Sequence, residues 1–169
     1  MSEPAEGERV RRARQGDRRA FGELVERHRS AVFGLCLHLL GSADDAQDAT
    51  QDAFLRAYQR LGQLRDPAAF PAWLATIARR ECRHHRRREG SLGEPTEAAE
   101  GVGDAGERLE RRRLAARLRE HLQALSPDTR LIYLLSCLDG LTSQRIGAFL
   151  DLKPGTVRAR LLRARRRLA

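Results

Sequence analysis

The sequence predicts an all-α fold made of two small helical domains that are joined by a flexible acidic linker. Leu, Ala, Arg and Glu are abundant while aromatic residues make up only 5% of the chain, a composition that favours helices over strands. Apolar residues recur at helical spacing in two separate blocks. Between the blocks, residues 90–107 hold five acidic side chains, no basic ones and almost nothing that could be buried, which is typical of a linker.

The first domain is expected over residues 19–89, after an N-terminal extension of residues 1–18. Gly41 predicts the end of a helix, because glycine readily takes the left-handed conformation that follows one. Ser42, with Asp45 three residues later, predicts the capped start of the next helix. Apolar spacing and these signals together give three expected helices, over about residues 19–40, 43–61 and from 67 or 71 to 88.

The second domain is expected over residues 108–169. Its first helix spans about residues 109–125. Ser126 followed by Pro127 then predicts the start of another helix, since a capping residue with proline at the first helical position is a strong start signal. That helix ends before Gly140.

Residues 142–168 have the plan of a helix-turn-helix: a short capped helix, a tight turn and a longer basic helix. Spacing places Val157, Leu161 and Leu162 against the core and arginines on the opposite face. Arginine reads guanine edges or clamps phosphate, so this face is expected to bind DNA. A merely solvated basic face is the alternative interpretation. The expected DNA contacts are Lys153, Thr156, Arg158, Ala159, Arg160 and Arg163.

The net charge of +9 at pH 7 favours a polyanionic partner, either nucleic acid or an acidic membrane surface. Cys36, Cys82 and Cys137 are scattered along the chain and fit a reducing compartment better than a disulfide framework. Residues 1–16 lack the apolar core of a signal peptide, and no apolar run reaches the roughly 18 residues that span a bilayer. We therefore expect a cytoplasmic protein without membrane insertion.

Both halves of the chain resemble one known family. GLTSQRIGAFLDLKPGTVRARLLRARRRL is similar to the C-terminal promoter-binding domain of the extracytoplasmic-function (ECF) group of bacterial sigma factors. FGELVERHRSAVFGLCLHLLG, DDAQDATQDAFLRAYQRL and DPAAFPAWLATIARRECRHHRRR follow the order and spacing of that family's first domain. The resemblance implies a non-enzymatic factor that binds core RNA polymerase, recognises the −35 element, and recognises and melts the −10 element.

The resemblance also implies roles for matching positions. The helix after Ser42 would dock on the clamp helices of polymerase, although from periodicity alone it is an ordinary amphipathic helix with a solvated acidic face. The stretch from Leu61 to Arg88 would open the −10 element and hold a flipped base. The implied polymerase contacts are Asp45, Asp48, Gln51, Asp52, Phe54 and Arg56. The implied −10 contacts are Trp73, Arg79, Arg80, Arg83, Arg86 and Arg87, although a Trp is more commonly buried in the core. The last helix would read the −35 element.

Five positions depart from the family's pattern. Arg80 stands where Asn is frequent and Pro71 replaces a polar or basic residue, which bears on the −10 preference. Arg145 stands where the family favours an acid, and Lys153 replaces a usual Ser cap. Asp151 takes the usual glycine position in the turn, which Asp tolerates because it is among the few residues that visit left-handed geometry.

The implied partners are promoter DNA, the clamp helices and flap of core polymerase, and an anti-sigma factor, commonly membrane-bound in this family. In holoenzyme the protein would be associated with the nucleoid. No cofactor is expected.

Two other classes of function and a metal site fit the sequence less well. A stand-alone repressor or activator explains the helix-turn-helix but gives residues 20–89 no role. A nuclease would need a carboxylate cluster, and a solvated or partner-binding face is the better interpretation of Asp44, Asp45, Asp48 and Asp52. Cys82, His84 and His85, even with His121 or Cys137, match no standard zinc spacing, so no metal is expected.

Overall fold

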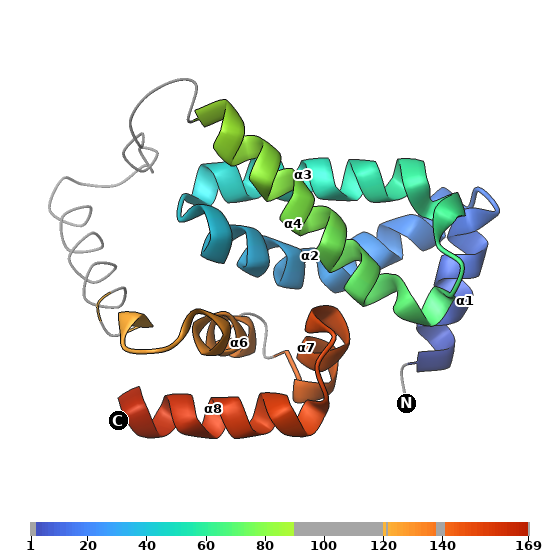
Figure 1. Ribbon diagram of the computed structural model, residues 1–169. Helices are drawn as coiled ribbons and strands as arrows, with labels where there is room; N and C mark the ends of the chain where they lie inside the picture. The colour runs from blue at the N-terminus through green and yellow to red at the C-terminus, as the bar shows by residue number, and fades with distance from the viewer. Residues whose placement is uncertain (1–2, 90–119, 121, 138–140, 169) are drawn as a thin grey trace, which may run out of the picture.

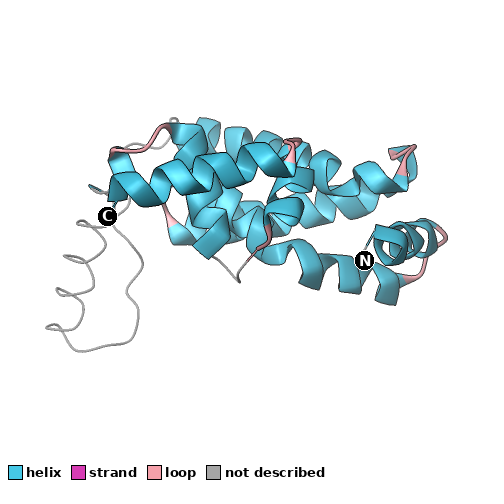
Figure 2. Ribbon diagram, turned by 90° about the horizontal axis from the view of Figure 1, so that it is seen from below, coloured by secondary structure: helices cyan, strands magenta, loops and turns pink. Residues whose placement is uncertain are grey.

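The computed structural model describes residues 3–89, 120, 122–137 and 141–168, and the regular secondary structure in these ranges is entirely helical (Figures 1 and 2). This confirms the all-α prediction. The expected linker and most of the helix expected over residues 109–125 lie outside the described residues. Within them, no helix is both long and apolar enough to cross a membrane. In chain order the elements are α1 (Glu3–Arg14), α2 (Arg18–Leu40), α3 (Ala43–Arg60), the 3-10 turns η1 (Leu61–Gln63) and η2 (Pro67–Ala69), α4 (Phe70–Glu89), α6 (Pro127–Cys137), α7 (Ser143–Leu150) and α8 (Pro154–Leu168).

The helix limits of the first domain follow the predicted signals. Gly41 ends α2 with φ 78° and its N–H donates to the Leu37 carbonyl. The Ser42 hydroxyl accepts a hydrogen bond from the Asp45 N–H at 3.4 Å and caps α3. α4 begins at Phe70, between the two expected starts, because the 3-10 turn η2 occupies the residues before it.

Small residues on α3 allow the first domain to pack closely. Ala46, Ala49, Ala53 and Ala57 are fully buried, so α3 lies directly against α2 and α4. α2 and α4 supply the larger core side chains, among them Leu24, Leu35, Phe70 and Leu74. Cys36 and Cys82 lie in the same core, where free cysteines behave as small apolar residues.

Residues 3–14, expected as part of an N-terminal extension, form helix α1 and pack on α2. Among residues 6–14, whose side chains the structure describes, Val10 and Ala13 are the buried apolar residues of α1, too few to give a visible periodic signal. Ion pairs supply the rest of the attachment. Arg9 bonds Glu23 at 2.9 Å, and the buried Glu6 contacts both Arg27, at 2.5 Å, and His28, at 3.1 Å. Because these partners lie on another helix, the sequence alone did not reveal the anchor.

The Glu6 anchor makes stability dependent on pH. Burial by itself would raise the pKa of Glu6, but the hydrogen bonds and charges of His28 and Arg27 prevail and lower it. A carboxyl whose pKa is depressed on folding stabilises the native state above its unfolded pKa, and this contribution is lost as the pH falls. We expect Glu6→Gln to lower the free energy of unfolding by about 1–3 kcal/mol at pH 7, and the difference to shrink below pH 4.5.

Urea unfolding from pH 7 to pH 3 measures this difference. Glu8→Gln, on the exposed side of the same helix, is the matched control and should change stability little at any pH. A Glu6→Gln penalty that stayed constant down to pH 3 would show that the carboxylate charge is not what stabilises α1.

The second domain packs directly on the first. α6 lies against α2 and α7 lies against α4, while α8 covers α6 and α7 (Figure 1). Ile132, Leu135, Ile146 and Phe149 join the same apolar cluster as the core of the first domain. The two domains therefore share one continuous core, which the sequence had not predicted.

Candidate nucleic-acid interface

Local hydrogen bonds define both ends of α7, the first helix of the helix-turn-helix. The Thr142 hydroxyl accepts the Arg145 N–H at 3.3 Å and caps α7. At the other end, Asp151 takes the left-handed conformation, φ 56°, and the Leu152 N–H donates to the Gly147 carbonyl at 2.8 Å. The predicted cap, turn and left-handed Asp are confirmed. Gly147 is essential to this turn, since a Cβ there would lie 2.5 Å from the Leu152 carbonyl oxygen.

The recognition helix α8 is seated by Val157, Leu161 and Ala164, which are buried against α6 and α7. The prediction that Leu162 faces the core is wrong, because its side chain is 53% exposed. Ala164 takes that place: it lies seven residues after Val157, two helical turns on along the same face. Leu162 falls between the exposed arginines instead.

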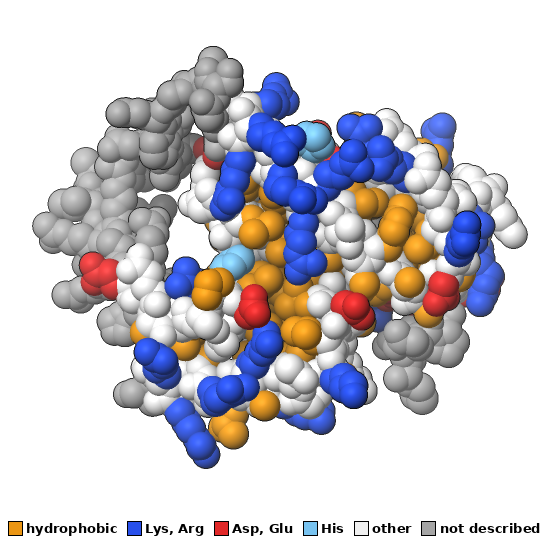
Figure 3. Space-filling view, in the orientation of Figure 1, with side chains coloured by type: hydrophobic (Ala, Val, Ile, Leu, Met, Phe, Trp, Pro, Cys, Tyr) orange, Lys and Arg blue, Asp and Glu red, His pale blue; other side chains and the backbone are white. Residues whose placement is uncertain are grey.

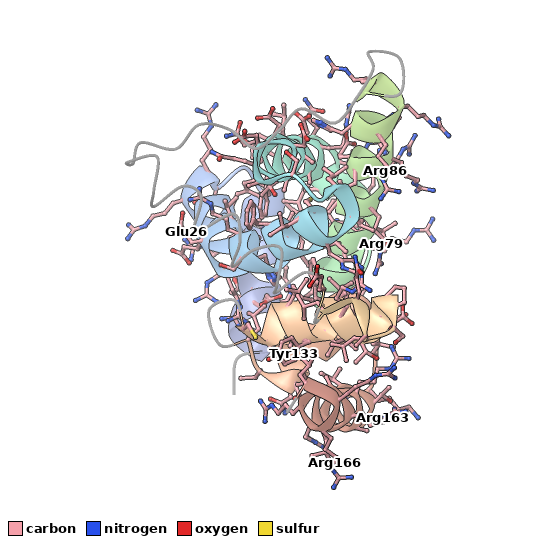
Figure 4. All side chains as sticks on the ribbon, turned by 90° about the vertical axis from the view of Figure 1, so that its left-hand side faces the viewer. Glu26, Arg79, Arg86, Tyr133, Arg163 and Arg166 are labelled. Carbon is pink, nitrogen blue, oxygen red and sulfur yellow. The ribbon has the colours of Figure 1, made fainter. Side chains whose placement is uncertain are left out.

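Most of the predicted −35 contacts lie on the open face of α8. Arg163 and Arg166 project away from α6 (Figure 4). Arg160 is partly enclosed and lies 3.4 Å from the carboxylate of Asp128, at the start of α6. A phosphate that approaches Arg160 would compete with this exposed carboxylate. The remaining predicted contacts, Lys153, Thr156, Arg158 and Ala159, are exposed near the N-terminal end of the helix.

A second basic surface runs along α4. Figure 3 shows Lys and Arg side chains gathered along this helix, and Figure 4 shows Arg79, Arg86 and Arg163 directed to one side of the molecule. Arg86 also donates to the Leu39 carbonyl in the last turn of α2, so part of its guanidinium is engaged in packing. Trp73 is half-buried, with its ring 6.0 Å from that of Phe70. The arginines predicted to contact the −10 element, Arg79, Arg80, Arg83, Arg86 and Arg87, are all exposed.

The predicted polymerase-docking residues on α3 divide into two groups. Asp48 and Gln51 are exposed and Asp45 is half-buried. Asp52 accepts from His85 at 2.8 Å, and Arg56 lies 3.6 Å from the buried carboxylate of Glu81. These two pairs join α3 to α4, so Asp52 and Arg56 help to hold the two helices together.

Phe54 was expected on this docking surface but is 7% exposed and belongs to the core. It lies four residues after the buried Thr50 and therefore on the buried stripe of α3. Leu55, 58% exposed, and Tyr58, 42% exposed, supply the apolar surface in its place. Their position off the apolar stripe is the signal that could have identified them in the sequence.

The cysteines and histidines do not assemble a metal site among the residues that the structure describes. His85 bonds Asp52, and Cys82 contacts Cys36 within the core. The hydrogen bond to Cys36 and burial raise the pKa of the Cys82 thiol, so it stays protonated at neutral pH.

The structure has a helix-turn-helix with an open basic face, a second basic helix on a separate domain, and a mixed acidic and apolar face on α3. These features indicate a DNA-binding protein with a further surface for a protein partner. Comparisons with known proteins give the family. Residues 24–91 match the model of sigma-70 region 2, and residues 115–168 match that of sigma-70 region 4. The chain belongs to the ECF group of RNA polymerase sigma factors and initiates transcription by binding core RNA polymerase and recognising promoters, without being an enzyme.

Individual relatives agree with this assignment. The chain is 32% identical to RNA polymerase sigma-H factor of Pseudomonas aeruginosa and 33% identical to ECF RNA polymerase sigma-E factor of Escherichia coli K12. Each alignment covers 92% of this chain and 88% of the relative. Among solved structures, CnrH in complex with the cytosolic domain of CnrY superposes with a TM-score of 0.64 at 28% identity, covering 97% of this chain and 94% of CnrH.

Proposed function

We propose that three separate surfaces divide the work of promoter recognition. Residues 19–89 carry the polymerase-docking surface on α3 and the −10 surface on α4, and residues 108–169 carry the −35 surface on α8. The observation that supports this most directly is that two helices on different domains each expose a row of arginines. One chain can therefore contact two distant stretches of DNA.

The −35 contact would be made in the major groove. Arg158 and Ala159 lie one turn into α8, where a recognition helix meets base edges. Arg158 can bond guanine bidentately, and the methyl group of Ala159 can meet a thymine methyl. Arg163 and the arginines after it are placed further along the helix and would hold phosphate.

The −10 contact would involve single-stranded DNA. The exposed arginines of α4 can follow the phosphates of a strand released from the duplex. The 3-10 turns before α4 leave Arg65 and Asp66 exposed, as residues at the edge of a base-binding loop would be. Trp73, which is half-buried on Phe70, would line the edge of that site.

Polymerase would bind α3, whose polar face carries Asp48 and Gln51. We expect the double variant Asp48→Ala with Gln51→Ala to weaken binding to core polymerase by about tenfold or more, because the few residues that dominate an interface typically cost more than about 1 kcal/mol each when truncated. Gel filtration or fluorescence anisotropy with purified core polymerase measures this affinity. The matched control, Glu8→Ala with Gln15→Ala, also removes one carboxylate and one amide side chain, from α1 and from the residue that follows it, and should bind normally. Equal affinities for the two double variants would remove α3 from the docking role.

Run-off transcription tests the whole assignment. Purified core polymerase with and without this protein would transcribe the promoter of the protein's own operon. A discrete start site that requires the protein and is lost in the docking variant supports the three-surface scheme. If the chain bound the promoter equally well without polymerase, a stand-alone DNA-binding regulator would be the better description.

We further propose a cytoplasmic location and regulation by an anti-sigma partner. The net charge of +9 fits a protein that works on nucleic acid in that compartment. CnrH was solved with the cytosolic domain of CnrY, which supports the idea that this fold is bound by another protein. Copurification of this chain with a membrane fraction that contains such a partner, and its release on induction, would be the expected behaviour.

A further inference from the structure

Arg160 differs from the other arginines of the recognition helix. Its side chain is 27% exposed, and its Nη1 atom lies 3.4 Å from the Oδ2 atom of Asp128, on α6. The position in the helix explains the enclosure, because Arg160 precedes the buried Leu161 and lies about one turn before the buried Ala164. It therefore lies on the flank of α8 that borders α6 (Figure 1). The remaining arginines of α8 are exposed, namely Arg158, Arg163, Arg165, Arg166 and Arg167.

Asp128 is held beside Arg160 by the packing that seats α8. Its carboxylate lies in the first turn of α6, where the helix dipole stabilises a negative charge. The guanidinium of Arg130 donates to the carbonyls of Leu122, at 2.9 Å, and Leu125, at 3.2 Å, and so ties the start of α6 to the residues before it. These two leucines pack on α8 in one apolar cluster. The core of the second domain therefore sets the distance between the acid and the arginine.

Asp128 brings a negative charge to the edge of a basic helix. Its side chain is 78% exposed, so the carboxylate reaches solvent next to Arg160. An ion pair this exposed contributes little to folding stability, and its main consequence is the charge that α8 presents. A phosphate that bonds Arg160 must also approach the carboxylate, and the two negative charges repel each other. Arg160 therefore contributes less to phosphate binding than Arg163, which projects away from α6 (Figure 4).

We propose that Asp128 restrains sequence-independent DNA binding by α8, because its carboxylate engages Arg160 and offsets the charge of that arginine. This rests on the DNA-binding role proposed above for α8. Sequence-independent affinity depends on the number of phosphates that Lys and Arg side chains neutralise. A chain with a net charge of +9 would otherwise be held by the many non-promoter sites of a chromosome. Arg158 lies two residues before Arg160 and so on a different side of the helix, and the restraint leaves its base contacts in place.

Fluorescence anisotropy of the full chain with a labelled duplex of unrelated sequence, at a series of NaCl concentrations, tests this restraint. Asp128→Asn removes the charge and retains the size of the side chain. Arg160→Gln and the double variant show whether the effect passes through Arg160. Glu120→Gln is the matched control, since it removes one exposed acid from the same domain and changes the net charge equally. Arg166→Ala reports whether α8 binds this duplex at all.

Asp128 also acts on the first domain, through His38 of α2. Burial and the positive charge of Arg130 lower the pKa of His38, and the charge of Asp128 opposes them. An effect of Asp128→Asn through His38 does not need Arg160, so the double variant separates it from the proposed restraint.

We expect Asp128→Asn to bind the duplex about two- to fivefold more tightly than the unmodified chain at low salt, which is the size of effect typical of one exposed ion pair. The dependence of affinity on salt should steepen by about one phosphate contact, because Arg160 is released. In the Arg160→Gln background the same substitution should give a smaller gain, close to that of Glu120→Gln.

Unchanged or weaker binding of Asp128→Asn would overturn the proposal, and weaker binding would show instead that Asp128 orients Arg160 toward DNA. An equal gain with and without Arg160 would also overturn it, because the carboxylate would then act only through its general field. Arg166→Ala distinguishes this failure from that of the proposed function. If Arg166→Ala weakens binding while Asp128→Asn changes nothing, only the restraint is wrong; if Arg166→Ala has no effect, α8 is not the DNA-binding helix.

Discussion

Arg158→Ala is expected to reduce promoter-specific transcription by about 5- to 150-fold, the range that corresponds to the 1–3 kcal/mol of one good base contact. Arg158 is exposed one turn into α8, beside the buried stripe that contains Val157 and Leu161. Loss of its guanidinium removes a pair of directional donors that no neighbour replaces in the same position. The effect should be confined to the −35 sequence.

Run-off transcription on matched templates isolates this effect. Arg158→Ala should lose the preference for the native −35 element over a mutated one, while its affinity for core polymerase is unchanged. Arg166→Ala, further along the same helix, should instead weaken binding to all templates equally and lower the salt dependence by about one counterion. Arg14→Ala removes an exposed arginine from α1 and serves as the neutral control. If Arg158→Ala behaved like Arg166→Ala, Arg158 would be a phosphate contact rather than a reader of sequence.

Gly147→Ala is expected to destabilise the second domain by about 1–3 kcal/mol, the usual cost of overpacking. The added Cβ would lie 2.5 Å from the Leu152 carbonyl oxygen and 3.5 Å from the Pro154 nitrogen. Both atoms belong to the backbone of the turn. The hydrogen bond from Leu152 to the Gly147 carbonyl, at 2.8 Å, holds that backbone in place, so the clash cannot be relieved by a side-chain movement.

Gly22→Ala provides the same chemical change with the opposite expected sign. Gly22 lies inside α2, and a Cβ there would meet nothing within 4 Å. Alanine should therefore stabilise the helix by up to about 1 kcal/mol. Urea unfolding followed by circular dichroism compares the free energies of unfolding of the two variants. Hydrogen exchange shows whether the loss of stability in Gly147→Ala is located in α7 and α8. Equal or greater stability of Gly147→Ala would mean that the turn is less tightly built than the structure shows.

Local signals in the sequence were sufficient for most helix boundaries. A capping side chain and the backbone it caps are close in sequence, so Thr142, Ser42 and Gly41 acted as predicted. The left-handed conformation of Asp151 is equally local. The same reasoning located the exposed arginines of α4 and α8, because charge is excluded from a helix face that is buried.

Contacts between distant residues explain most of the errors. Leu162 is an apolar residue near the edge of the buried stripe of α8, and only the neighbouring helices decide on which side of that edge it falls. Phe54 lies on the buried stripe of α3, so its expected exposure came from the family resemblance and not from its spacing. α1 was missed because Glu6 is held by Arg27 and His28, more than twenty residues away. Arg86 is engaged with the carbonyl of Leu39 for a similar reason. None of these pairings leaves a periodic pattern.

The sequence by itself determined the all-helical class, the helix-turn-helix and the arginine faces, since each depends on residues within a few turns of one another. Tertiary structure decided how the helices are used. It turned Leu162 outward, paired Asp52 with His85, and brought Arg145 of the second domain onto α2. Packing between helices depends on side chains that meet only in the folded chain. The packing of the two domains on each other therefore could not be predicted from the sequence.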